Sequence, residues 1–200
     1  MLHTLKFLSS WFTHTKDALF CPSLPWSYRW RLLALQPITL LTYCMTYLPY
    51  AFSCRYSVID IPTSGRHTVR AIVFRPLKGV PSKLHPLHID FHGGAFVGGI
   101  AEYDAPFCEL VSDRVGAVVV SAEYRCAPAH MYPCAHEDAE DVMDWVLSNA
   151  KKLWNADPDS LTISGSSAGG NLMFTAGNRA KAAVGLCAVV CRATRHIILM

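Results

Sequence analysis

The residue best placed for chemistry is Ser167, at the centre of the run Gly165-Ser166-Ser167-Ala168-Gly169. This run fits G-x-S-x-G and lies between a predicted strand and a predicted helix, the context in which the pattern carries a nucleophilic serine. Such a serine occupies a sharp, strained turn that projects its hydroxyl from the sheet. Glycine at Gly165 and Gly169 avoids crowding the serine side chain. The pattern therefore predicts acyl transfer through a serine hydroxyl.

A second glycine-rich loop predicts the hydrogen-bond donors that this chemistry requires. His92-Gly93-Gly94-Ala95-Phe96 directly follows a predicted strand, and its small residues can bring backbone N–H groups against a substrate carbonyl. The helix that begins at Ala168 points its first amides toward the same site, where they can stabilise a developing oxyanion. His92 lies on this loop and upstream of the serine, so we expect it to order the loop and not to act as a base.

The elements that must position these residues follow from hydrophobic periodicity and turn signals. Strands are predicted over 56–61, 68–74, 87–91, 117–121 and 161–164, and helices over 104–115, 137–154 and 168–176. The turn cluster at 62–65 joins the first two strands into a hairpin, and Gly116 ends the first helix. Because strand and helix alternate from residue 87 onward, the predicted fold class is α/β, with a mainly parallel sheet and flanking helices.

Three blocks of sequence, in this order, resemble the hormone-sensitive-lipase-like group of α/β-hydrolases, which includes arylacetamide deacetylase and many microbial esterases. The run 92–96 resembles H-G-G-G-F/W, the run 124–138 resembles Y-R-x-A-P…P…E-D, and the run 165–171 resembles G-D-S-A-G-G-N. The resemblance covers roughly residues 55–200 and implies the α/β-hydrolase fold and a small-molecule ester substrate. It implies that Ser167 is the acyl-accepting nucleophile. The oxyanion hole would be formed by the backbone amides of Gly93, Gly94, Ala95 and Ala168, and the 124–128 block would be structural.

The sequence departs from this family pattern in ways that affect catalysis. Ser166 replaces the usual aspartate beside the nucleophile, for which we expect altered tuning and not loss of chemistry. The family order is serine, then Asp or Glu, then histidine. After Asp159 the sequence has no acidic residue, and His196 is the one histidine after Ser167. We therefore expect a fragment of an esterase that lacks the triad acid and histidine and is nearly inactive by itself.

The same comparison leads to two expectations about the sheet. The run 197–200 resembles the opening of the sixth strand, so the C-terminal strands of the fold would be missing and the fifth strand would keep an unpaired apolar edge. His88 and Asp90 also place polar groups on a strand that should be buried on both faces, a conflict that the sequence does not explain.

Residues 1–54 form a predicted cap or membrane-interface segment, and residues 55–200 the N-terminal part of a catalytic domain. The stretch 32–54 carries no charge and is flanked by arginines, but Pro37 and Pro49 are expected to interrupt its helix. A cap helix or a helix in the membrane interface is favoured over a bilayer-spanning one. Since no signal-peptide layout is visible, we expect a cytoplasmic or membrane-associated protein that is not secreted.

Composition excludes several classes of function. With a net charge of +3 and scattered basic residues, the sequence gives no indication of nucleic-acid binding. Its eight cysteines have no C-x-x-C pair, which favours free thiols, and Cys187, Cys191 and His196 are expected in the core and not on a metal. We expect neither a metal nor a cofactor. The alternative to a carboxylic ester hydrolase is a non-catalytic protein that binds a hydrophobic ligand or associates with a membrane.

Overall fold

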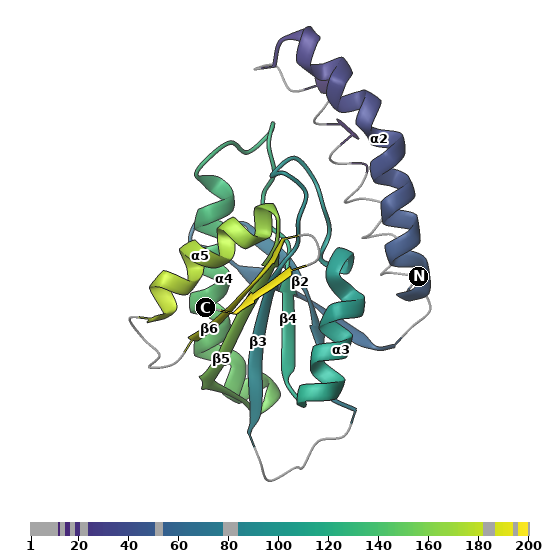
Figure 1. The fold of residues 1–200 in the computed structure, drawn as a ribbon. Coiled ribbons are helices and arrows are strands. Elements are labelled where there is room, and N and C mark those ends of the chain that lie inside the picture. Colours follow the sequence, from purple (N-terminus) through teal and green to yellow (C-terminus); the bar gives the residue numbers. More distant parts are fainter. Residues whose placement is uncertain are drawn as a thin grey trace.

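A computed structural model of the chain describes residues 12, 15–16, 19–20, 24–50, 54–77, 84–181, 187–193 and 196–199. The described strands form one seven-stranded sheet in the order β1-β2-β4-β3-β5-β6-β7 (Figure 1). The four strands β4, β3, β5 and β6 are parallel, and antiparallel strands flank them on both sides. The mixed α/β architecture that the alternating pattern predicts is confirmed.

The strands in chain order are β1 Tyr56–Pro62, β2 Thr68–Phe74, β3 His85–Phe91, β4 Val118–Ala122, β5 Ala156–Ser166, β6 Cys187–Ala193 and β7 His196–Leu199. β1 and β2 form the predicted antiparallel hairpin. All five residues of β4 are buried, as expected of a strand that is covered on both faces. The parallel strands β3 and β5 end on the same side of the sheet, which places residues 92 and 167 at one edge.

Helices cover both faces of the sheet (Figure 1). The short 3-10 helix η2 Ala101–Asp104 and helix α3 Ala105–Val115 lie on one face, over a core that includes Phe74 and Cys108. Helices α4 Cys134–Trp154 and α5 Ala168–Lys181 lie on the other, over a core that includes Met143 and Leu172. α3 ends as predicted at Gly116, whose φ of 74° is left-handed and whose N–H donates to the carbonyl of Ser112.

Several elements differ from the sequence-based expectations, among them α4, β5 and the sixth strand. α4 begins at Cys134, three residues before the acidic cluster from which its start is predicted. The N-cap residue, Pro133, makes no side-chain hydrogen bond, so no capping residue in the sequence indicated the earlier start. β5 begins at Ala156 and not at 161. The placement of the sixth strand was wrong: β6 Cys187–Ala193 pairs with β5 and covers the edge expected to be unpaired, and residues 196–199 form β7, which turns back antiparallel to β6.

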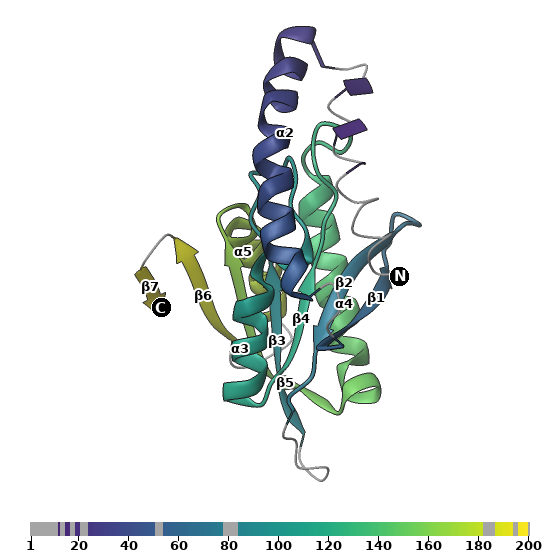
Figure 2. The ribbon, with the colours of Figure 1, turned by 90° about the vertical axis from the view of Figure 1, so that its right-hand side faces the viewer.

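The N-terminal segment contains a long helix, α2 Trp26–Tyr47, followed by the 3-10 helix η1 Leu48–Tyr50. Pro37 lies inside α2, so the expectation that it interrupts the helix was wrong; a proline removes one backbone hydrogen bond, and the remaining turns hold. Figure 2 shows α2 extending beyond the body of the molecule, which it meets at its C-terminal end. There Tyr50 packs against Tyr56 and Phe74. No described helix has the length and apolarity needed to cross a bilayer.

Candidate active site

Ser167 lies between the end of β5 and the start of α5, in the strained conformation that the pattern predicts. Its φ is 51°, in the left-handed region that a non-glycine residue rarely adopts. The flanking glycines allow this turn because a Cβ on Gly165 would lie 2.4 Å from the backbone of Gly169, and a Cβ on Gly169 would lie 1.9 Å from the carbonyl oxygen of Phe91. The start of α5 therefore packs directly on the ends of β5 and β3.

The 92–96 loop lies against this turn. A Cβ on Gly93 would be 3.5 Å from the Cβ of Ser167 and 3.1 Å from the carbonyl oxygen of Ser166, so the backbones of the two motifs are in contact. The next residues turn sharply: φ is 142° at Gly94, 54° at Ala95 and 62° at Phe96. The N–H of Val97 donates to the carbonyl of Gly94 at 3.0 Å, which closes the turn. The structure thus brings together the two segments that the sequence singles out.

The histidine of the loop is used to hold it in place. His92 is fully buried, and its Nδ1 lies 2.7 Å from the carbonyl oxygen of Gly93, so Nδ1 donates. The ring stacks on Tyr124 with 4.5 Å between centroids, and the Tyr124 hydroxyl donates to the His92 carbonyl at 2.9 Å. The N–H of Ala127 donates to the carbonyl of Phe96 at 2.7 Å. These contacts tie the 92–96 loop to the segment that begins at Tyr124.

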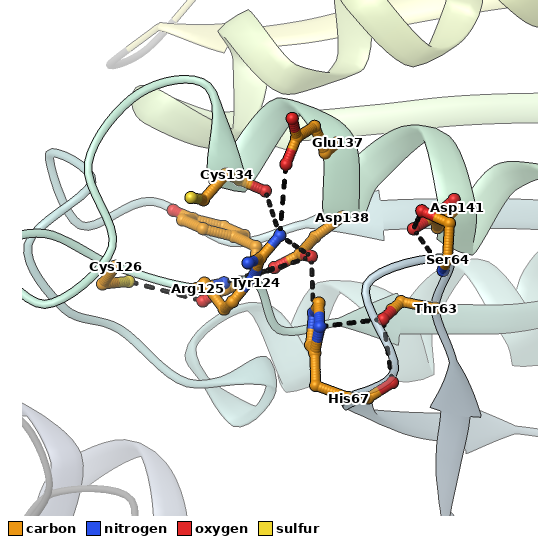
Figure 3. A network of polar contacts seen from close by, with 10 residues as sticks. All are labelled: Thr63, Ser64, His67, Tyr124, Arg125, Cys126, Cys134, Glu137, Asp138 and Asp141. Atoms are coloured by element: carbon orange, nitrogen blue, oxygen red, sulfur yellow. Dashed lines mark hydrogen bonds and ion pairs between the residues drawn. The ribbon is translucent and has the colours of Figure 1, made fainter.

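The segment at Tyr124 is in turn fixed by a buried carboxylate (Figure 3). Asp138 on α4 has no exposed side-chain area and accepts hydrogen bonds from the backbone N–H of Arg125 at 2.8 Å and from its Nε at 3.0 Å. The same carboxylate lies 2.8 Å from Nε2 of His67, in the β1–β2 turn. The hydrogen bond to Asp138 raises the pKa of Arg125. One buried charge thus joins the hairpin, α4 and the segment under the 92–96 loop.

The polar residues of β3 are compensated by hydroxyls on neighbouring strands. His88 contacts Thr162 Oγ1 at 2.6 Å and Ser164 Oγ at 2.9 Å, and Ser164 donates to Asp90. Ser121 donates to the carbonyl of Ala101 at 3.1 Å and lies 3.4 Å from Asp90. Burial lowers the pKa of His88 to about 4, so the ring is neutral near pH 7. The apparent conflict on this strand is therefore resolved by a side-chain ladder across the sheet.

Sequence reasoning missed this ladder, although a signal was present. Thr162, Ser164 and Ser166 alternate along β5, and the strand register places Thr162 beside His88 and Ser164 beside Asp90. Hydroxyls at every second residue of a buried strand indicate one polar face. Ser166 continues this alternation and directly precedes Ser167.

The described side chains include no hydrogen-bond partner of the Ser167 hydroxyl. No histidine in the described part of the chain is hydrogen-bonded to the Ser167 hydroxyl. His196 lies in β7, and its side chain is outside the described set. Within the described residues, no group of three histidine, cysteine, aspartate or glutamate side chains has the arrangement of a metal site. The five cysteines whose side chains are described are free thiols.

Comparisons with known proteins agree with this geometry. The chain is 32% identical over 129 residues to a probable carboxylesterase 8 of Arabidopsis thaliana, a match that covers 58% of this chain and 39% of the relative. It is also 37% identical over 106 residues to the gibberellin receptor GID1B of the same plant, covering 50% of this chain and 28% of the receptor. The solved structure of an esterase from Pyrobaculum calidifontis superposes with a TM-score of 0.63 at 34% identity, covering 75% of this chain and 49% of the esterase.

The chain thus spans less than half the length of these relatives. Residues 88–199, which contain the 92–96 loop, the Tyr124 segment and Ser167, match the family Abhydrolase_3, of the alpha/beta hydrolase fold. Because this match covers more than half of the chain and the observed sheet carries both motifs at the same edge, the chain belongs to this alpha/beta hydrolase family.

Proposed function

We propose that this chain carries the nucleophile and oxyanion hole of a serine-dependent carboxylic ester hydrolase. The observation that supports this most is the contact between the two motifs: Gly93 lies against Ser166 and Ser167, and a Cβ on Gly93 would be 3.5 Å from the Cβ of Ser167. A nucleophile and its oxyanion donors must share one small site, so this contact is required by the chemistry. The carboxylesterase relatives and esterase structures are consistent with the proposal.

In the proposed reaction, the Ser167 oxygen attacks the carbonyl carbon of a small-molecule ester and its proton passes to a general base. The carbonyl oxygen becomes an oxyanion that accepts hydrogen bonds from backbone amides in the 93–95 loop and at Ala168. Collapse of this intermediate expels the alcohol and leaves an acyl-serine, which water hydrolyses. The family resemblance assigns the acid and the base to positions after Ser167, and this sequence has no aspartate or glutamate there, so we expect slow hydrolysis by this chain alone.

The test is hydrolysis of p-nitrophenyl butyrate, with fluorophosphonate labelling in parallel. Binding and an oxyanion hole can leave about 10³-fold acceleration over water when triad members are absent, so wild type should exceed the background rate measurably. Ser167→Ala should abolish labelling but can keep part of the acceleration, because binding and the oxyanion hole do not depend on the serine hydroxyl. Ser148→Ala, which removes an exposed hydroxyl on α4, should change neither. A folded wild type that is not labelled, or labelling that Ser167→Ala leaves unchanged, would refute the proposal.

A non-catalytic role is the second candidate, because one relative bears the name of a receptor. In that case the same fold would hold a hydrophobic ligand and Ser167 would not react. A folded wild-type protein that shows neither labelling nor turnover, and whose thermal midpoint rises with added hydrophobic ligands such as long-chain fatty acids, would favour this candidate over the hydrolase.

We also propose that the N-terminal helix binds the surface of a membrane that contains anionic lipid. The exposed fractions of Trp26, Tyr28 and Trp30 at the start of α2 are 68%, 54% and 54%. Arg31 lies over the Tyr28 and Trp30 rings, at 5.6 and 5.8 Å from their centroids. No acidic residue lies between Asp17 and Asp60 in the sequence. Exposed tryptophan, tyrosine and arginine with no acidic neighbour in sequence are typical of a helix at the membrane interface.

Sedimentation with lipid vesicles tests the membrane proposal. Wild type should co-sediment with vesicles of phosphatidylcholine and phosphatidylserine, and the double variant Trp26→Ser/Trp30→Ser should bind at least about 10-fold more weakly. Leu77→Ser is the matched control, since this side chain is 74% exposed at the end of the hairpin, far from α2 in sequence. Binding that the tryptophan substitutions leave unchanged would contradict the role of α2.

A further inference from the structure

The hydroxyl of Ser166 lies where three segments meet. Ser166 is the last residue of β5 and precedes Ser167 directly. Its Oγ donates to the Oδ2 of Asp104 at 3.0 Å. The same Oγ would lie 2.9 Å from a Cβ on Gly93, so it occupies the space that a side chain at Gly93 would need. The orientation of this one side chain is therefore linked to both halves of the candidate site.

Asp104 is directed toward this hydroxyl instead of serving its own helix. It occupies the N-cap of α3, where an aspartate ordinarily accepts hydrogen bonds from the first turn, yet it makes no side-chain capping bond. Its exposed fraction is 7%. A carboxylate that is so little exposed to solvent needs hydrogen-bond donors from the protein, and the Ser166 hydroxyl is one of them.

The short helix that carries Asp104 is itself held by buried contacts. Glu102 has no exposed area and accepts a hydrogen bond from Arg70 on β2 at 3.0 Å. The Tyr56 hydroxyl on β1 also donates to Glu102, at 3.1 Å. On the other side, Ser121 of β4 donates to the carbonyl of Ala101 at 3.1 Å. Three strands thus fix η2, so Asp104 offers a rigid acceptor to the turn at Ser167.

We infer that Asp104 is a positioning residue, which acts through Ser166 to hold the Ser167 turn and the 93–95 loop in one geometry. The Asp104 carboxylate fixes the Ser166 rotamer, and the Ser166 side chain then packs against Gly93. Loss of this hydrogen bond would let the loop and the turn separate, which lowers the rate of the chemical step more than the binding of substrate. This inference rests on the proposed ester hydrolysis.

The test compares Asp104→Ala, Ser166→Ala, the double variant and two conservative variants. Asp104→Ala and Ser166→Ala should each lower kcat about 10-fold with KM within twofold, and the double variant should be no worse than either, since both remove one hydrogen bond. Ser166→Thr keeps the hydroxyl and Asp104→Asn keeps an acceptor oxygen, so both should stay within about threefold of wild type. Asp144→Ala, an exposed aspartate on α4, is the control and should match wild type.

A second readout does not depend on turnover. Amide hydrogen exchange at Val97 and Asn171, whose N–H groups donate to the carbonyls of Gly94 and Ser167, should become at least about 10-fold faster in Asp104→Ala, while exchange at Ile89 in the middle of β3 stays unchanged. Unchanged exchange at Val97 and Asn171 overturns the inference, whether or not the wild type hydrolyses esters. If the wild type is inactive, the proposed function fails while the exchange result still decides the role of Asp104. An active Asp104→Ala with wild-type kcat and unchanged exchange overturns the inference alone.

Discussion

Replacing Gly93 by alanine tests the contact between the two motifs most closely. The added methyl would lie 2.9 Å from the Oγ of Ser166 and 3.1 Å from its carbonyl oxygen, where ordinary contact begins at 3.4 Å. The neighbours must therefore yield by about 0.5 and 0.3 Å, the differences between 3.4 Å and these two distances. The hydroxyl can rotate away, but only by leaving Asp104, and the carbonyl can move only with the backbone of the Ser167 turn.

The expected cost to stability is modest and the cost to reactivity is large. One extra methyl in a packed site costs about 1–3 kcal/mol, or roughly 2–12 °C in the thermal midpoint of a chain of this size. Displacing the oxyanion donors relative to the serine should cost about 10²-fold or more in kcat/KM. The measurements are thermal unfolding by circular dichroism and hydrolysis of p-nitrophenyl butyrate.

Gly116→Ala provides the matched control. A Cβ at this position would meet no atom within 4 Å, but the φ of 74° makes alanine unfavourable there by about 1 kcal/mol. The two variants should therefore have similar thermal midpoints and differ only in hydrolysis. If Gly93→Ala hydrolyses the ester at the wild-type rate, the 93–95 loop does not share a site with Ser167, and the reasoning from this contact is wrong.

Three further predictions concern stability. Burial lowers the pKa of His88 to about 4, so on acidification the unfolded chain takes up a proton near pH 6.5, before the folded chain does. The free energy of unfolding should therefore fall by about 3 kcal/mol from pH 6.5 to pH 4. Denaturant titrations at these two pH values should show a smaller fall in His88→Gln. Asp138→Ala leaves Arg125 without its buried partner and should lower the free energy of unfolding in urea by about 3–5 kcal/mol. Asp141→Ala, on the same helix, removes only exposed hydrogen bonds from Ser64 and should lower it by less than about 1 kcal/mol. Equal losses in the two variants would contradict the role of burial. Gly169→Ala should prevent stable folding, because its methyl would meet the Phe91 carbonyl oxygen at 1.9 Å, and a wild-type circular dichroism spectrum and thermal midpoint would refute that contact.

The sequence predicted the elements with strong local signals. The β1–β2 hairpin, β3, β4 and α3 lie within two residues of the predicted ranges, since period, turn residues and Gly116 all indicate the same boundaries. The start of α4 had no such signal, because Pro133, Cys134 and Ala135 offer no capping side chain. β5 begins among residues typical of turns, Asp157-Pro158-Asp159-Ser160, and is held there by pairing with β3 across a register shift.

The two motifs of the candidate site were recognised from the sequence, but the contacts that support them were not. Ser167 and the 92–96 loop are recognisable because each pattern is contiguous in sequence. The support depends on pairs far apart in the chain: His88 with Thr162, Asp90 with Ser164, and Asp104 with Ser166 are separated by 74, 74 and 62 residues. Such pairs become visible only once the strand register is known, which is why the polar residues of β3 looked like a conflict.

The central claim is that the Ser167 hydroxyl and the amides of the 93–95 loop act on the same carbonyl group. A crystal structure of the protein after reaction with a p-nitrophenyl phosphonate ester tests this directly. We predict a covalent bond from Ser167 Oγ to phosphorus, with one phosphoryl oxygen within about 3.1 Å of amide nitrogens from the 93–95 loop and Ala168. An adduct on another residue, or a phosphoryl oxygen directed away from the loop, would contradict the account.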